Sequence, residues 1–508
     1  MKLHVTIDSR IRFLLADARK VFGDAGVREL LKQFTHKNPT FYKARAQGFW
    51  SKESPKIETY GSSDDGQMIT LPRGGMSRLR ACARDKGVGL VFKDNRVAGE
   101  LLGGEQIPNH QAYDSQGRAC SLWDHQQRAM EAVLIKQNCL IRAATASGKT
   151  TTALALIARL KVPSLVIVWT QSLLKQWTER CAKELGLQPR EIGIIRGGSR
   201  RLKPVTIAMQ QTLARGITRE ELNTFGLVIM DEAQRAPATT FFKAIDPFPA
   251  RYRIGISADE TRADHKEFLT YDLFGEIADE VSRKELETLG VVVKIEIILI
   301  PSKFTAPWWT RVQQFDDADL RSEQKSNHQL NEEIATNEQR NKLILDVARE
   351  EASKNQQLLI FTLLREHARK LDQQVSSYDI KSGLLLGGDE YAAEFDTTAA
   401  AVKAGTCRVA SGTIQAIGTG NDFPRVSAGI LAHPIRNNRQ LFMQVRGRIA
   451  RAFDGKQSGR LYVIYDEEVF GVSMIRNFIR WNGGNVFVKT NTGLQDGAEY
   501  LRHHKRRR

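Results

Sequence analysis

A run of small residues lies where a strand is expected to give way to a helix, and its composition suits phosphate binding. The segment reads Ala143-Ala144-Thr145-Ala146-Ser147-Gly148-Lys149-Thr150 and is followed by helix formers over 151–160. Small side chains allow backbone N–H groups to close on phosphates at a helix N-terminus. The strict pattern GxxxxGK[ST] is not met, because Ala143 holds the place of the first glycine. We expect the following nucleotide contacts: Lys149 on the β- and γ-phosphates, the Thr150 hydroxyl on Mg²⁺, and Thr145, Ala146, Ser147 and Gly148 around the phosphates.

Two adjacent carboxylates at the end of an apolar run suit the same chemistry. Asp231 and Glu232 follow Phe225–Met230 and open the sequence Asp-Glu-Ala-Gln, which ends at Gln234. A carboxylate at the C-terminal tip of a strand can hold a Mg²⁺ ion with its water shell, and its neighbour can orient or deprotonate the attacking water. We expect Asp231 to take the first role and Glu232 the second. A solvent-facing acidic turn is the alternative.

The apolar pattern supplies two sets of parallel strands that would position these residues. Strand-like runs alternate with helical stretches from about 119 to 290, at 139–143, 164–169, 205–209, 227–230 and 253–256. The rhythm returns after about 337, at 358–361, 383–386, 407–410, 429–432 and 461–464. Such alternation is typical of parallel sheets covered by helices. Between the two sets, residues 301–336 are polar and helical, with Trp308 and Trp309 near the start.

The chain ahead of the first α/β half reads as a small α+β block. Short alternating segments at 3–7, 11–15, 67–71 and 89–92 surround expected helices near 27–34 and 76–84. We divide the chain into a nucleic-acid-binding domain at 1–103, a linker at 104–118, α/β domains at 119–290 and 291–485, and a basic tail at 486–508. The end of this tail, 502–508, is a cationic run that is either solvated or in contact with phosphates.

Cations and aromatics are interleaved in the first block. Lys43 and Arg45 stand close to Phe49 and Trp50, and the second expected helix carries Arg78, Arg80 and Arg84. This mixture suits contacts to backbone phosphates together with stacking on bases. The alternative is a small domain with a basic surface and no such role.

Composition limits the class of protein and of partner. The chain has 508 residues, which suggests about three domains. Lys and Arg exceed Asp and Glu by 75 to 58, a surplus of 17 that favours a polyanionic partner, nucleic acid before an anionic membrane surface. No apolar run approaches the roughly 20 residues of a membrane span. The five cysteines are scattered without a CxxC pair, so we expect a reduced, cytoplasmic protein without structural zinc.

The motifs of the first half resemble those of superfamily 2 helicases and translocases, ATPases with two RecA-like domains. Leu122–Gln126 resembles the adenine-reading Q motif, in which Gln126 would contact the base. Residues 165–177 resemble motif Ia, and 205–212 resemble motif Ib. The resemblance implies nucleic-acid contacts from Thr170, Gln171, Gln176, Gln211 and Thr212. Ser257-Ala258-Asp259 takes the place of Ser-Ala-Thr in motif III, with Asp259 where the motif has threonine.

The second half carries the matching set. Leu358–Phe361 with Glu366-His367-Ala368 resembles motif IV, and Thr413 would contact nucleic acid. Gly418–Pro424 resembles motif V, in which Gly420 and Asp422 would face the nucleotide. Gln444–Arg451 resembles motif VI, Q-x-x-G-R-x-x-R, and implies that Arg448 and Arg451 stabilise the charge that develops on the γ-phosphate. An ordinary pair of surface arginines is the alternative.

Within the superfamily, the chain resembles the UvsW-type helicases of tailed phages and their XPB-type relatives. The similarity lies in Leu273–Ile277, Leu286–Val293 and Asn337–Asn341, and more weakly in the first block. Arg262 and Asp264 resemble a short Arg-x-Asp element that helps DNA engagement, with a simple surface turn as the alternative. The implied fold is two tandem RecA-like domains behind a small α+β DNA-binding domain.

The implied activity is ATP- and Mg²⁺-dependent remodelling of branched DNA: forks, junctions and R-loops, with RNA in hybrids. Alternatives are the motor of a restriction or defence system with a separate nuclease, an RNA helicase, and a scaffold with a decayed ATPase site. A recombination partner is a further possibility, and no membrane partner is expected. The Trp308–Trp309 segment is either a wedge at the junction or structural packing. Deleting residues 1–100 is expected to leave basal ATP hydrolysis and to weaken fork binding.

Overall fold

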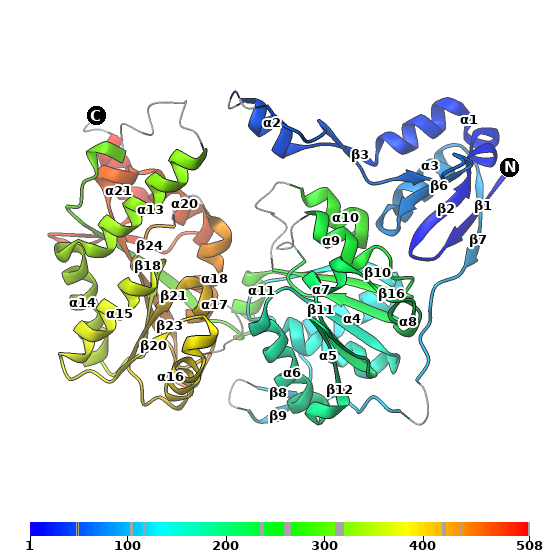
Figure 1. Ribbon diagram of the computed structural model, residues 1–508. Helices are drawn as coiled ribbons and strands as arrows, with labels where there is room; N and C mark the ends of the chain where they lie inside the picture. Colours follow the sequence, from blue (N-terminus) through cyan, green and yellow to red (C-terminus); the bar gives the residue numbers. More distant parts are fainter. Residues whose placement is uncertain are drawn as a thin grey trace. The chain divides into compact units, whose positions relative to one another are not determined.

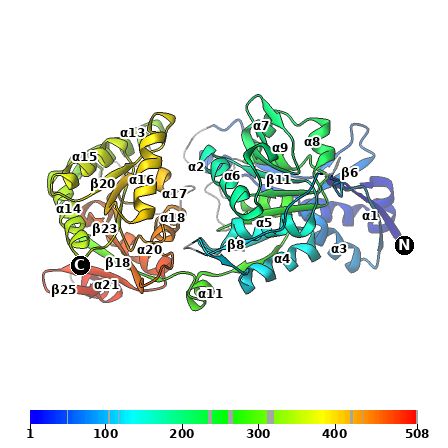
Figure 2. The same cartoon turned by 90° about the horizontal axis from the view of Figure 1, so that it is seen from below.

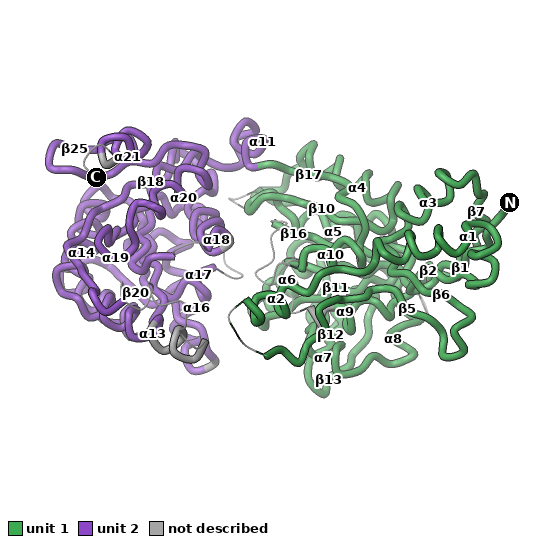
Figure 3. The backbone as a smooth tube through the Cα atoms, turned by 90° about the horizontal axis from the view of Figure 1, so that it is seen from above, with its two compact units in different colours: residues 1–282 green, residues 283–508 purple. Residues whose placement is uncertain are grey.

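The computed structural model describes residues 1–46, 48, 50–101, 105–114, 117–233, 238–258, 266–309, 320–418, 423–435 and 438–505. The chain divides into two compact units, residues 1–282 and residues 283–508, which Figure 3 colours separately. The expected boundary between the α/β halves, at 290, therefore lies eight residues beyond the observed one. Each unit is described by itself.

The first block forms a five-stranded sheet with two helices (Figure 1, blue). Its strand order is β5-β6-β2-β1-β7. The alternation expected in the sequence is present, because Leu3 and Val5 of β1 point into the same core as Ile11 and Phe13 of β2. The elements are β1 (Lys2–Ile7), β2 (Arg10–Leu14), α1 (Leu15–Lys32), β5 (Gly61–Ser62), β6 (Met68–Pro72), α3 (Met76–Asp85) and β7 (Gly89–Asp94). Helix α1 begins earlier than expected and is broken at Gly23, whose φ is 71°.

An arm, residues 35–58, extends from this block. Strand β3 (Thr35–Lys37) pairs antiparallel with β4 (Lys56–Glu58), and helix α2 (Pro39–Ala46) lies between them in the sequence. Figures 1 and 2 show α2 beyond the end of this hairpin, away from the five-stranded sheet. The sequence pattern predicted neither the hairpin nor the arm.

The first α/β half has an eight-stranded sheet in the order β13-β12-β14-β11-β15-β16-β10-β17. All pairings are parallel except that of β12 with β13. The strands are β10 (Asn138–Ala143), β11 (Ser164–Val168), β12 (Ile192–Arg196), β13 (Ser199–Arg201), β14 (Val205–Met209), β15 (Leu227–Met230), β16 (Tyr252–Ser257) and β17 (Ile277–Val281). The central strands β11, β14 and β15 are buried along their whole length because helices cover both faces of the sheet (Figures 1 and 2).

The helices of this half follow the strands in the order expected of a doubly wound sheet. They are α4 (Asp124–Lys136), α5 (Lys149–Leu160), α6 (Gln171–Leu185), α7 (Gln210–Arg215), α8 (Arg219–Thr224), α9 (Ala238–Ile245) and α10 (Glu267–Phe274). Ahead of α4, the expected linker is packed against this half. Ile107 and Ala112 are buried, and strand β8 (Ala112–Tyr113) pairs with β9 (Ala119–Cys120).

Unit 2 repeats the plan with the strand order β20-β21-β19-β22-β23-β18-β24-β25. Its strands are β18 (Lys294–Pro301), β19 (Leu358–Thr362), β20 (Ser382–Leu385), β21 (Val409–Thr413), β22 (Ala428–Leu431), β23 (Ser458–Tyr465), β24 (Val486–Thr490) and β25 (Gly493–Asp496). Its helices include α11 (Arg283–Thr288), α13 (Leu320–Thr336), α14 (Glu338–Ser353), α15 (Arg365–Ser376), α16 (Ala392–Ala404), α17 (Ile414–Gly418), α18 (Arg439–Ile449) and α20 (Ser473–Asn482). The two parallel-dominated sheets confirm the expected α/β class with tandem RecA-like domains.

The expected basic tail at 486–508 is wrong over its described part. Strand β24 pairs parallel with β18, with Ile297 opposite Val486, and helix α21 (Gly497–Lys505) packs on β24. Val486 and Val488 are buried, so their alternation is the mark of a half-buried strand. The high charge of the last seven residues concealed this pattern.

The insertion around 301–336 is structural where it is described. Trp309 is 1% exposed and packs in a small cluster with Phe304, Leu330 and Ile334. The Trp308 indole N–H donates to Glu333 at 3.0 Å. The packing alternative therefore holds for Trp309, since its ring cannot reach a nucleic acid without leaving that cluster. Residues 310–319 lie outside the described residues.

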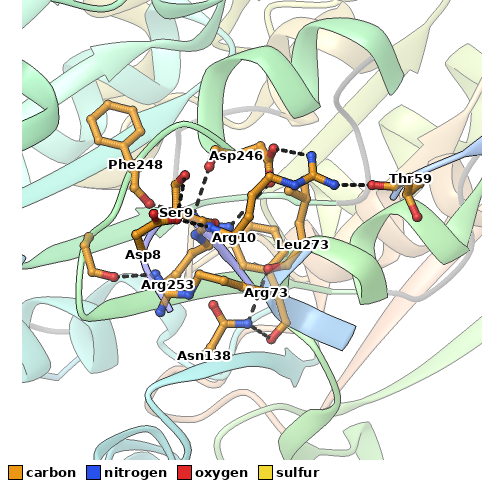
Figure 4. A network of polar contacts seen from close by, with 12 residues as sticks. Asp8, Ser9, Arg10, Thr59, Arg73, Asn138, Asp246, Phe248, Arg253 and Leu273 are labelled. Carbon is orange, nitrogen blue, oxygen red and sulfur yellow. Dashed lines mark hydrogen bonds and ion pairs between the residues drawn. The ribbon is translucent and has the colours of Figure 1, made fainter. Parts of the chain in front are cut away.

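A buried polar network joins the N-terminal block to the first α/β half (Figure 4). Arg253, fully buried at the start of β16, donates to the Ser9 carbonyl at 2.9 Å and to the Phe248 carbonyl at 2.6 Å. Arg10 pairs with Asp246 at 2.8 Å, and Arg73 donates to the backbone carbonyls of residues 250 and 251. Burial lowers the pKa of Arg253 to about 10. The block is thus an integral part of unit 1.

Two further findings concern membrane-spanning helices and the cysteines. None of the helices in the described part of the chain is both long and apolar enough to cross a membrane. The five cysteines form no disulfide, and four of them are buried.

Candidate nucleotide site and nucleic-acid contacts

The phosphate loop forms as expected between β10 and α5. Strand β10 ends at Ala143, and α5 begins at Lys149 with Gly148 as its N-cap in the left-handed conformation, φ 78°. Ala146 also has positive φ, at 82°, whereas Ala143 does not. The missing first glycine is explained, because this position needs no left-handed conformation. The Lys149 ammonium donates to the Ala143 carbonyl at 3.2 Å.

The acid pair lies at the carboxyl end of β15. The Asp231 side chain accepts the indole N–H of Trp177 at 2.9 Å and the backbone N–H of Glu232 at 2.9 Å. Burial raises the pKa of Asp231 to about 6, with help from the Glu232 charge, while Trp177 and the Lys149 ammonium oppose the rise. A divalent cation would favour the ionised form. The Lys149 charge acts on the Asp231 carboxylate, so the two groups lie near each other, and their roles toward a nucleotide stay predictions.

Glu232 holds a strained backbone at the same place. Its φ is 52°, in a region that non-glycine residues rarely adopt. The next residue, Ala233, donates its N–H to the Ile256 carbonyl of β16 at 3.0 Å. This contact fixes the turn that carries both carboxylates against the neighbouring strand.

Gln126 is tied to the phosphate loop. It is buried, its side-chain amide donates to the Ser147 carbonyl at 3.2 Å, and its carbonyl accepts the Trp123 N–H at 3.0 Å. A Cβ on Gly148 would lie 2.2 Å from this amide nitrogen, so glycine is required there. Contact with adenine stays a prediction. What the geometry does show is a glutamine that holds the loop in place.

The residues present fit a Mg²⁺-bound nucleoside triphosphate. The Ser147 hydroxyl is buried and has no hydrogen-bond partner among the residues that the structure describes. Thr150 follows Lys149 in the first turn of α5, so its hydroxyl and the Asp231 carboxylate would offer the hard oxygen ligands that Mg²⁺ prefers. Backbone N–H groups at the start of α5 would contact the phosphates.

The expected nucleic-acid contacts of unit 1 differ in accessibility. Gln171 and Gln211 are exposed, and Gln176 is half-buried. Thr170 caps α6 by accepting the Leu173 N–H at 3.2 Å. Thr212 is buried and its hydroxyl accepts the Gly197 N–H at 3.0 Å, so it supports the β12–β13 turn. Of the two motif Ib residues, Gln211 and Thr212, Gln211 is the accessible one.

The arginines of the motif VI segment divide into two kinds. Arg446 is buried on α18, 3.7 Å from Glu287, and burial lowers its pKa to about 9. Arg448 and Arg451 are half-buried, and Arg448 donates to the Gly418 carbonyl at 2.5 Å. Thr413, at the end of β21, accepts the Ala416 N–H at 3.3 Å. The two arginines chosen from the sequence are the two accessible ones.

Several expected site residues lie outside the described residues. They are Gln234, Asp259, Arg262, Asp264, Gly420 and Asp422. Their roles stay predictions.

The sequence analysis missed a buried carboxylate behind the phosphate loop. Glu184 is 1% exposed and pairs with Arg180 at 2.7 Å and His110 at 2.9 Å. The Arg180 guanidinium also donates to Thr151 at 2.6 Å, next to Thr150. Arg180 and Glu184 stand four residues apart, a spacing that marks a helical ion pair but not its partners. Trp177 was missed as well, because its contact with Asp231 is 54 residues distant.

A pair of buried histidines underlies the motif IV segment. The rings of His367 and His433 lie 4.8 Å apart, and His367 Nε2 is 2.8 Å from the Asn341 side-chain oxygen. Burial, with nearby positive charge, lowers the pKa of His367 to about 2 and that of His433 to about 3. Both are therefore neutral packing residues.

Acid should destabilise unit 2 through these two rings. Below the ordinary histidine pKa of about 6.5, these two rings are protonated in the unfolded chain but stay neutral in the native chain. The free energy of unfolding therefore falls from about pH 6.5 down to about pH 3. The loss approaches about 1.4 kcal/mol per pH unit for each ring. Urea unfolding between pH 7.5 and pH 5 measures the slope. His367→Gln should reduce it and the exposed His503→Gln should not, and equal slopes for the two variants contradict the assignment.

Fold and site together define a P-loop nucleotide-binding protein with tandem RecA-like domains. Residues 119–261 match the family model described as "Type III restriction enzyme, res subunit". The "DNA 3'-5' translocase XPB2" of Sulfurisphaera tokodaii is 38% identical over 171 residues, 33% of this chain and 37% of that protein. "Probable helicase D10" of Escherichia phage T5 is 24% identical over 63% of this chain and 65% of its own length.

Two solved structures were also found to be similar. The structure of T4 UvsW covers 96% of this chain and 99% of its own, with 15% identity and a TM-score of 0.42. The structure of S. cerevisiae Dbp5 bound to RNA and ADP BeF3 covers 71% of this chain and 87% of its own, with 13% identity and a TM-score of 0.51. The sequence matches confirm the resemblance to superfamily 2 helicases and translocases of the XPB type and to a phage helicase. The matched segment spans little more than a third of the archaeal relative.

Proposed function

We propose that this protein is an ATP-dependent DNA helicase or translocase that remodels branched DNA. The observation that carries the proposal is the placement of the phosphate loop with Lys149, and of the Asp231–Glu232 pair, at the carboxyl ends of β10 and β15, two parallel strands that only β16 separates. The names of the relatives, a DNA translocase and a phage helicase, support DNA as the substrate. The net charge of +17 supports it as well.

The residues of the chain divide the work of hydrolysis. Backbone N–H groups of the loop and the Lys149 ammonium bind the phosphates, while Thr150 and Asp231 hold Mg²⁺, which neutralises phosphate charge when bound. Glu232 orients the attacking water or takes its proton. Arg448 and Arg451 stabilise the charge that develops on the γ-phosphate. We extend the 3'-5' direction in the name of XPB2 to this chain.

A substrate panel tests the proposal. ATP hydrolysis and strand separation are measured with a fork, a four-way junction, an R-loop, linear duplex, single-stranded DNA and RNA. We expect the fork, junction and R-loop to stimulate hydrolysis most and to be remodelled. Stimulation should fall steeply with salt because the grip is through phosphates. Hydrolysis that no DNA stimulates would refute the proposal, and stimulation by RNA alone would favour an RNA helicase.

The match to the restriction-enzyme family model favours one second candidate, a translocase that serves a separate nuclease. Such a motor moves along unbranched duplex. It should displace a triplex-forming strand from linear DNA and show no preference for forks. The same panel with a triplex substrate added separates the two functions.

A further inference from the structure

The tip of the arm exposes aromatic side chains. Trp50 is 74% exposed, Tyr42 is 47% exposed, and α2 has no buried residue. A single exposed apolar residue needs no explanation, whereas several grouped on one element mark an interaction site, so the grouping of aromatic residues on one short arm is the informative feature. Four of the arm's 24 residues are aromatic, about twice the 8% share of the whole chain.

The charge of the arm indicates what kind of partner it fits. The arm carries five cationic residues, Lys37, Lys43, Arg45, Lys52 and Lys56, against two acidic ones, Glu53 and Glu58. Glu53 is occupied, since it accepts the Asn38 side-chain amide at 2.8 Å. Cations beside exposed aromatic rings are the combination that grips unpaired nucleic-acid strands, with phosphates on the cations and bases on the rings.

Contacts within the arm hold its shape. The Asn38 N–H donates to the Pro55 carbonyl at 3.0 Å, and its side chain bonds both Glu53 and the Ser54 carbonyl. The Arg45 guanidinium lies 5.9 Å from the centre of the Phe41 ring, and that ring meets Tyr42 edge-on at 5.3 Å. These contacts and the ordered helix α2 mean that the arm loses less conformational freedom when it binds a partner.

The root of the arm is fixed to the first α/β half through Asp272 of α10. This carboxylate is 1% exposed, accepts hydrogen bonds from Thr59 and Arg78, and lies 2.9 Å from His36 Nε2. The His36 ring also stacks on Phe268 of the same helix at 4.0 Å. The Thr59 carbonyl accepts the Arg10 guanidinium, which extends the network of Figure 4 to the arm. Arg78 was expected to contact phosphates, but its guanidinium is bonded to Asp272 at the root of the arm.

We propose that the arm contacts the unpaired bases at a junction between duplex and single-stranded DNA. Trp50 and Tyr42 stack on the bases, and Lys43 and Arg45 face the adjacent phosphates. Asp272 keeps the arm in a fixed position relative to the half of unit 1 that carries the phosphate loop. This role rests on the proposed function. It identifies the arm as the element that meets the junction, a role that the buried Trp309 cannot fill.

The test uses the full-length protein and a fork with 2-aminopurine at its first unpaired position. Stacking of an aromatic ring on this base changes its fluorescence, and the measurement needs no ATP. We expect Trp50→Ala and Tyr42→Ala each to lose most of the change and to slow fork unwinding about tenfold. Leu14→Ala, an exposed apolar residue of the same block outside the arm, is the matched control.

Each result has a defined meaning. Loss of the fluorescence change in Trp50→Ala but not in Leu14→Ala supports the contact. An unchanged signal and unchanged unwinding in both arm variants overturn it and point to a protein partner for the arm. Wild-type hydrolysis that DNA does not stimulate would refute the proposed function instead, and the fluorescence of the wild-type complex would still report whether the arm touches bases.

Discussion

Replacing Lys149 with alanine should abolish turnover of ATP while leaving the fold and DNA binding intact. The ammonium lies at the loop between β10 and α5 and its charge acts on Asp231, so we expect it to neutralise the β- and γ-phosphate charge under the proposed function. Removing one such group typically costs roughly 10²–10³ in rate, and we expect kcat to fall at least that far. The measurement is steady-state hydrolysis with saturating fork DNA.

A matched control separates this effect from a loss of general charge. Lys136 is an exposed lysine at the end of α4 in the same unit, and Lys136→Ala should keep kcat within about twofold. Fork affinity should be similar in both variants. A Lys149→Ala protein that hydrolyses ATP at the wild-type rate would exclude the loop as the catalytic phosphate site.

Local patterns explain why much of the nucleotide site could be predicted. A strand, a small-residue loop and a helix are consecutive in the chain, so the sequence around Lys149 specifies their arrangement almost alone. Asp231 is distant in sequence, but the carboxyl ends of parallel strands meet at one edge of a sheet. The alternation of apolar runs with helical stretches was therefore enough to predict Asp231 at the same edge of the sheet as the loop that ends at Lys149.

Contacts between distant residues explain what could not be predicted. Asp272 meets His36, Thr59 and Arg78 across more than 190 positions, and nothing near any of them in sequence marks the pairing. The same holds for Trp177 and Asp231. Thr212 shows a second limit, because a motif position does not specify which contact a side chain makes. Its position suggested a nucleic-acid contact, whereas in the structure its hydroxyl supports a turn.

Because the first block packs on the first α/β half, deleting the block would not measure its DNA contacts alone. Removing residues 1–100 takes away the partners of Asp272 and the Ser9 carbonyl that Arg253 uses. Uncompensated buried charge is strongly destabilising, by about 3–5 kcal/mol per broken pair. Loss of hydrolysis in the truncated protein would thus reflect damage to unit 1, and exposed arm residues such as Trp50 give the cleaner test of DNA contact.

Arg448 and Arg446 lie two positions apart on α18, and their replacements should fail in different ways. Arg446 is buried beside Glu287, so Arg446→Ala should lower the free energy of unfolding by about 1–3 kcal/mol and largely spare kcat of the folded protein. Arg448 is half-buried and donates to the Gly418 carbonyl, so Arg448→Ala should cost less free energy of unfolding than Arg446→Ala.

The effect of Arg448→Ala should appear in kcat instead. A guanidinium that meets γ-phosphate charge in the transition state contributes roughly 10³–10⁵ in rate, and we expect a loss in that range with little change in the KM for ATP. Arg448→Lys should recover only part of it, because an ammonium lacks the two-pronged geometry that phosphate oxygens accept. Urea unfolding and steady-state kinetics on the three variants check both halves of the contrast. If Arg448→Ala is destabilised as much as Arg446→Ala but keeps its kcat, Arg448 serves the packing of unit 2, and Arg451 becomes the remaining candidate for the γ-phosphate.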